Sequence, residues 1–210
     1  MSIDWSATGA MLQGWGTLIG AVAVFWAAKK GADTFDSWKR QKVAERKLEQ
    51  AERILMATYK ARRALSFVRG IMMDGRELDA AEEKLKVDFA RWDQQDEMRQ
   101  KRLRTAQAYF NRLEKTKPEQ DELFECLPVA RALFGIELEA AVEKLSRQFW
   151  IVQVDVESYI DDHGDDTEFT KNIRRGMYEV SPRKGEVNEV SETIIQAITA
   201  IEKICLPSLR

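Results

Sequence analysis

The hydrophobic positions of this chain follow two patterns. Residues 5–28 form one uncharged run, WSATGAMLQGWGTLIGAVAVFWAA, whereas the later apolar residues recur at spacings of three and four, as in amphipathic helices. A bilayer hydrocarbon core is about 30 Å thick and needs roughly 20 apolar helical residues to cross it. The pattern therefore predicts a transmembrane anchor at residues 1–30, followed by a helical domain at 31–210.

Charge and tryptophan placement predict how the anchor is oriented. Trp5 and Trp26 bracket the apolar run, and tryptophan prefers the membrane interface. Lysine and arginine are concentrated after the run, at residues 29–47, and such an excess stays on the cytoplasmic side. A cleaved signal peptide is disfavoured because the chain starts with MSID, which is not basic. We expect a single-pass protein of the cytoplasmic membrane, with its N-terminus outside and its domain in the cytoplasm.

Small residues line one face of the predicted anchor, which suggests that it self-associates. They alternate at spacings of four and three: Gly9, Gln13, Gly16, Gly20, Ala23 and Ala27. Gly16 and Gly20 form a GxxxG motif, which lets two helix backbones approach closely, and the Gln13 amide would hydrogen-bond a partner rather than face lipid. The expected partners of this segment are the lipid bilayer and a second copy of the chain, in a homo-oligomer.

The rest of the chain predicts an all-α fold, a long-helix antiparallel bundle of five or six helices. Helices are expected at 35–73, 79–117, 119–126, from Pro128, and at 137–162, 166–178 and 187–205. The positions expected in the core are Leu55, Leu65, Phe89, Trp92, Phe110, Leu145, Phe149, Val152, Ile198 and Ile201.

Three points of this assignment have alternatives. Gly31 is either a hinge after the anchor or a residue within one unbroken helix, because a single glycine costs only about 1 kcal/mol. The hydrophilic stretch 93–102 is either a helix break or, as we favour, a solvated turn of a continuous helix. Residues 150–156, WIVQVDV, alternate like a strand, but the stripe that starts at Leu138 continues through them and favours a helix.

Two segments resemble a family of uncharacterised bacterial proteins that carry one N-terminal membrane helix. The first is WKRQKVAERKLEQAERILMATYKARRALSFVR, residues 38–69, and the second is the ending EVSETIIQAITAIEKICLP. The matching positions in the first segment are Trp38, Arg40, Gln41, Lys42, Glu45, Lys47, Ala51, Glu52, Ile54, Leu55, Tyr59 and Ala61. The resemblance implies membrane anchoring, here in the bacterial inner membrane, and an all-helical body. It brings no known activity.

Candidate chemistry is sparse. Residues 161–166, DDHGDD, are the one cluster of metal-ligand types, but the spacing does not match an EF-hand and is more typical of a helix end followed by an acidic N-cap. His163 is the only histidine, so a histidine-based triad would need it. Cys126 and Cys205 lack metal spacing and are expected to be reduced and structural. We therefore predict no catalytic, metal or cofactor site.

Charge is distributed unevenly around a net value of −2. Residues 29–75 carry a balance of +6 and residues 76–210 a balance of −7, so the distal body would repel nucleic acid. The basic stretch 39–47, with Phe35 and Trp38, is either an amphipathic segment on the lipid surface or, as we favour, a standing helix with local ion pairs.

These features predict a membrane-anchored interaction or scaffold protein that binds an unknown protein partner and is not an enzyme. Long amphipathic helices present stripes that partners can bind. The alternative is a membrane-perturbing or pore-forming effector, for example in phage defence.

Overall fold

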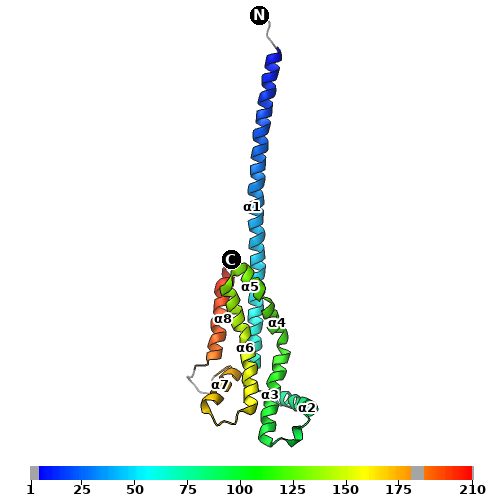
Figure 1. The fold of residues 1–210 in the computed structure, drawn as a ribbon, viewed down its shortest axis with the longest axis vertical. Helices are drawn as coiled ribbons and strands as arrows, with labels where there is room; N and C mark the ends of the chain where they lie inside the picture. The colour runs from blue at the N-terminus through cyan, green and yellow to red at the C-terminus, as the bar shows by residue number, and fades with distance from the viewer. Residues whose placement is uncertain (1–4, 181–186, 210) are drawn as a thin grey trace. The chain divides into compact units, whose positions relative to one another are not determined.

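The structure, a computed structural model, describes residues 5–180 and 187–209, except for the side chains of residues 5–22, 32 and 33. All regular structure in this part of the chain is helical (Figure 1). The chain divides into two units, Met1–Lys47 and Leu48–Arg210.

The first unit consists of the N-terminal part of helix α1 (Trp5–Val68), which passes through Gly31 without a break. Every side chain described between residues 23 and 47 is exposed. Local contacts support the helix: Thr34 Oγ1 donates to the Lys30 carbonyl at 2.8 Å, and the Phe35 and Trp38 ring centroids lie 6.0 Å apart.

No helix in the described part of the chain is both long and apolar enough to cross a membrane. Most of the predicted anchor, residues 5–22, lies outside the residues whose side chains are described.

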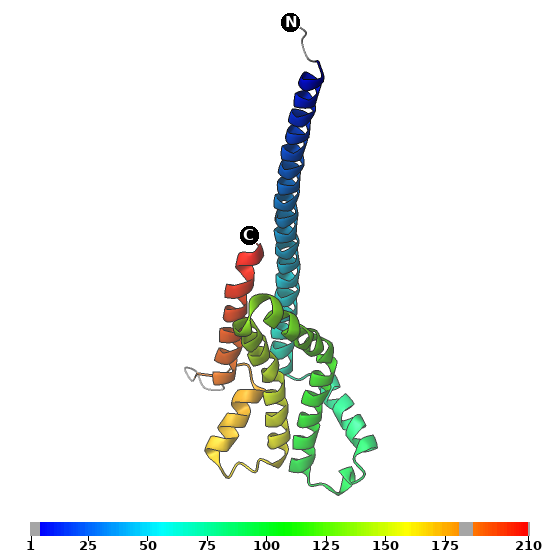
Figure 2. The ribbon, with the colours of Figure 1, turned by 45° about the horizontal axis from the view of Figure 1, so that its top comes forward.

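The second unit is a helical bundle, which confirms the all-α prediction. Residues 48–68 of α1, the α3–α4 pair, α6 and α8 run alternately in opposite directions, and the shorter α2 and α7 lie at one end (Figures 1 and 2). The elements after α1 are α2 (Gly75–Asp88), η1 (Trp92–Gln94), α3 (Glu97–Lys115), α4 (Lys117–Glu125), α5 (Leu127–Phe134), α6 (Ile136–Asp161), α7 (Thr167–Met177), α8 (Glu189–Cys205) and η2 (Leu206–Leu209). The described residues thus form eight α-helices, where the sequence predicted seven helical segments and a bundle of five or six helices.

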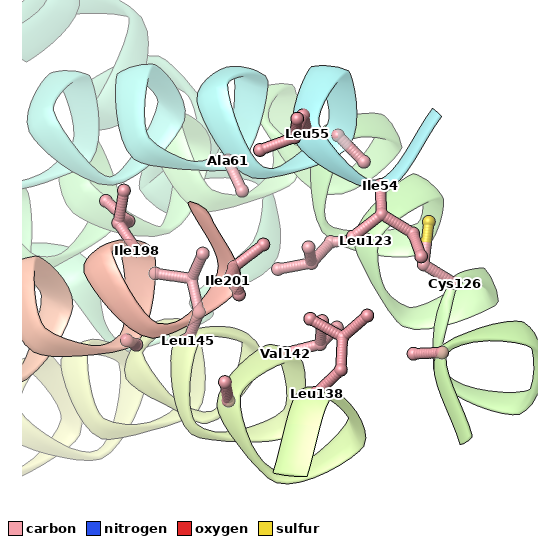
Figure 3. Packing of buried hydrophobic residues seen from close by; sticks show 14 of the residues in the cluster. Ile54, Leu55, Ala61, Leu123, Cys126, Leu138, Val142, Leu145, Ile198 and Ile201 are labelled. Carbon is pink, nitrogen blue, oxygen red and sulfur yellow. The ribbon is translucent and has the colours of Figure 1, made fainter. Parts of the chain in front are cut away.

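The main core joins one face each of α1, α4, α6 and α8. Figure 3 shows this packing, with Ile54, Leu55 and Ala61 from α1, Leu123 and Cys126 from the end of α4, Leu138, Val142 and Leu145 from α6, and Ile198 and Ile201 from α8. A second cluster around Val68, Tyr109 and Val152 continues the core toward α3 and α7. The predicted core positions are buried except Phe89, which is 36% exposed, and Phe110, which is partly buried.

The stretch 93–102 breaks the helix, so the predicted solvated turn was wrong. Helix α2 ends at Asp88, and Asp96 starts α3 by accepting a hydrogen bond from the Arg99 amide at 2.9 Å. A side-chain acceptor at this position satisfies an otherwise free amide, which favours a new helix start over continuation. Phe89 falls in the break and leaves the stripe that predicted its burial.

Two other helix ends also differ from the prediction. Helix α1 ends at Val68 rather than near residue 73, and α2 starts at Gly75 rather than at Asp79. Asp74 is the N-cap of α2 and accepts from the Glu77 amide at 2.9 Å. The 150–156 segment lies within α6, which confirms the helix prediction.

Candidate interaction surface

Arg112 joins the end of α1 to α2 and α3. Its guanidinium donates to the backbone carbonyls of Gly70 at 2.6 Å and Met72 at 2.7 Å, and pairs in a bidentate manner with the Glu77 carboxylate at 2.6 and 3.1 Å. The residue is buried in spite of its charge. Gly70 and Met72 directly follow the C-terminus of α1, and Arg112 Nη1 also lies 3.5 Å from the Val68 carbonyl. A buried cation at a helix C-terminus supplies donors to free carbonyls and complements the helix dipole. Arg112 thereby holds α1 against α3.

Arg69 joins the end of α7 to the end of α1 in a similar way. Its guanidinium donates to the carbonyls of Arg175, Gly176 and Tyr178 at 2.7–2.8 Å, and also to the side chains of Asn188 and Ser191. Burial lowers the pKa of Arg69 to about 10, against the opposing attraction of Glu179 and Asp155. The charge is retained near neutral pH, so Arg69 binds α7 and the start of α8 to the end of α1.

Two carboxylates of the acidic cluster 161–166 accept hydrogen bonds from nearby backbone amides. Asp166 is the N-cap of α7 and accepts from the amides of Glu168 and Phe169 at 2.9 and 3.1 Å, while Asp162 Oδ1 accepts from the Gly164 amide and the Thr170 hydroxyl. Nowhere in the described residues do three His, Cys, Asp or Glu side chains gather in a way that would hold a metal ion.

The other residues singled out from the sequence lie either on α1 or in the main core. Gly9, Gln13, Gly16 and Gly20 lie outside the described side chains, whereas Ala23 and Ala27 are exposed on α1. Cys126 and Cys205 are free thiols buried in the main core, where burial raises the pKa of both and that of Cys205 to about 11.

The feature best suited to bind a partner is a groove between α4 and α6, with a volume of about 580 Å³. Two large aromatic side chains line it and remain exposed, Phe124 at 63% and Trp150 at 57%. The Arg147 guanidinium lies 5.9 Å from the centroid of the Trp150 ring, within cation–π range. We refer to Phe124, Arg147, Trp150 and the groove between them as the aromatic groove.

The composition of the aromatic groove suits binding rather than catalysis. Tryptophan and arginine are enriched among the residues that carry most of the binding energy at protein interfaces. The groove also contains Lys117 and Asp121, which pair with each other one turn apart on α4. A partner would therefore meet an apolar centre with a polar rim, as at protein interfaces in general.

The sequence did not single out these aromatic residues. Phe124 follows Leu123 and Trp150 follows Phe149, and in each pair the first residue is buried and the second exposed. In a helix, consecutive residues point about 100° apart, so two adjacent large apolar residues cannot both face a narrow core stripe. Two adjacent large apolar residues in a predicted helix were therefore the feature of the sequence that could have indicated an exposed aromatic side chain.

Comparisons with protein-family models, curated proteins and solved structures found no match to this chain.

Proposed function

We propose that this protein is a membrane-anchored interaction protein, without catalytic activity, whose helical body binds a protein partner through the aromatic groove. The N-terminal helix holds it in the membrane as a homo-oligomer, and the body lies in the cytoplasm.

Support for the anchor comes from the uncharged sequence of residues 5–28 and from the helical backbone that α1 has over this range. The described end of the run exposes Val24, Phe25 and Trp26. Large apolar side chains exposed together on a helix favour transfer out of water, and a bilayer would remove them from it. Lys30 Nζ lies 5.5 Å from the Trp26 ring centroid, an arrangement suited to the headgroup region.

The single observation that carries the binding role is the exposure of Phe124 and Trp150 beside Arg147 in one groove. Exposing both rings to water is unfavourable unless a partner covers them, since burial of an aromatic side chain is worth roughly 1.5–3 kcal/mol. Helices α4 and α6 are held in place by the main core, in which Leu123 packs with Leu138 and Val142, so the groove is available without rearrangement of the fold.

The test is affinity purification of the full-length, detergent-solubilised protein with quantitative mass spectrometry. The double substitution Phe124→Ser, Trp150→Ser should reduce recovery of the specific partner by at least about tenfold, the effect of losing an interface hot spot. Phe169→Ser is the matched control, because Phe169 is exposed on α7 away from the groove. Equal recovery with both variants would contradict the proposed role of the groove.

Two further outcomes would overturn other parts of the proposal. Collapse of the membrane potential on overexpression, dependent on residues 5–28, would favour a pore-forming effector instead. In spheroplasts, an external protease should leave the body intact; cleavage of the body would reverse the proposed orientation.

A further inference from the structure

We propose that a second groove, between α1 and the corner where α3 meets α4, binds an acidic helical segment of a protein partner. This inference rests on the proposed function and specifies the kind of partner segment that the body binds, one that is helical and acidic. The groove has a volume of about 660 Å³ and lies on the other side of α4 from the aromatic groove.

The floor of this second groove is apolar and held in place. The Phe67 ring is 40% exposed in it, with Ala64 and Pro118 beside it. Two cations lie near the centroid of the Phe67 ring, the Arg112 guanidinium at 5.3 Å and Lys115 Nζ at 5.5 Å. Since Arg112 is itself fixed by its backbone and carboxylate partners, the ring is pre-organised, and an apolar side chain can cover it at little entropic cost.

The charges around this floor are unbalanced toward positive. The groove is lined by three cations, Lys60, Arg63 and Lys115, and two carboxylates, Glu119 and Glu122. Lys60 and Glu122 neutralise each other, with both carboxylate oxygens 2.9 Å from Nζ. Neither Arg63 nor Lys115 has a carboxylate partner among the described residues. Two unpaired cations against one remaining carboxylate favour an acidic occupant.

The spacing along α1 favours a helical occupant. Met56, Lys60, Arg63 and Phe67 follow each other at intervals of four, three and four on one face, with an exposed apolar side chain at each end and cations between. This face spans about 16 Å, at roughly 1.5 Å per residue. It matches a helix of about three turns that carries apolar residues at its two ends and Asp or Glu between them.

The test uses the full-length protein in phosphatidylcholine nanodiscs and a displayed library of random 16-residue peptides. Selected peptides should carry Asp or Glu between apolar positions. Their binding, measured by fluorescence anisotropy, should weaken at least about tenfold in Arg63→Glu and in Lys115→Glu, as expected for reversal of an interfacial charge. Lys203→Glu, an exposed cation on α8, is the matched control and should bind as the unsubstituted protein does.

The inference is overturned if no peptide is enriched over selection against the Arg63→Glu, Lys115→Glu double variant, or if the enriched peptides are neutral or basic. It is also overturned if the two cations are needed for binding to phosphatidylglycerol vesicles and not for peptide binding, since that assigns the groove to lipid. The proposed function is tested separately, because partner recovery through Phe124 and Trp150 can persist when peptide selection fails, and the reverse.

Discussion

Arg69→Met removes a buried charge whose partners lie more than a hundred residues away along the chain. The methionine retains most of the apolar stem and removes the guanidinium donors. The carbonyls of Arg175 and Tyr178 keep a second donor, because Asn188 Nδ2 lies 3.0 and 2.8 Å from them. The Gly176 carbonyl has no other donor among the described residues, so the substitution leaves it unpaired.

These contacts set the expected loss of stability. An unpaired buried carbonyl costs about 1–3 kcal/mol, and each of the other two charge-assisted bonds contributes about 1.5–3 kcal/mol. Against this, the substitution relieves the burial cost that lowers the pKa of Arg69 to about 10, which is about 3 kcal/mol. The free energy of unfolding should therefore fall by about 3 kcal/mol.

The measurement is urea unfolding of the full-length protein in detergent, followed by tryptophan fluorescence, together with hydrogen exchange read by mass spectrometry. Exchange should accelerate more in α7 than in α3, because Arg69 contacts the end of α7. Arg62→Met, at an exposed position of the same helix, is the control and should change stability by less than about 0.5 kcal/mol. A loss below about 1 kcal/mol for Arg69→Met, or unchanged exchange in α7, would refute this account.

Other predictions concern groups buried around the same helices. Burial raises the pKa of Asp155 to about 6, although nearby Arg69 opposes the shift. Because the pKa of Asp155 in the folded state lies above its ordinary value of 3.8, protonation of this carboxyl stabilises the fold. Its contribution to the free energy of unfolding is full below about pH 4 and is lost as pH rises through 6, a change of about 3 kcal/mol. In Asp155→Asn this pH dependence should be absent when unfolding is measured across the same pH range. Gly176→Ala places a Cβ against the carboxylate of Asp155 and should lower the thermal midpoint of unfolding, whereas Gly75→Ala, which has nothing within 4 Å of the added Cβ, should not. The two buried thiols, with raised pKa values, should react with Ellman's reagent only at the rate of unfolding; immediate reaction in native buffer would contradict their burial.

The aromatic groove and the two buried arginines depended on tertiary contacts. Charged residues in helical sequence normally indicate a solvated face, and nothing local to Arg69 or Arg112 distinguishes them from Arg62 or Arg63. Their burial arises because chain reversal brings free carbonyls at a helix end, or just after it, within reach of the guanidinium. Likewise, the exposure of Trp150 follows from where α4 and α6 leave a groove, which depends on how the helices pack.

Helix identity, by contrast, was encoded locally. The spacing of Leu138, Leu145, Phe149 and Val152 predicted α6 and its buried face, because a helix repeats every 3.6 residues and only one side can meet the core. The same argument identified the buried face of α8 with Ile198 and Ile201. Where periodicity was interrupted, as at residues 93–102, the local pattern was compatible both with a helix break and with a solvated turn of a continuous helix. There the structure has a break, and Asp96 caps the new helix, because its carboxylate satisfies one of the first free amides of α3, that of Arg99.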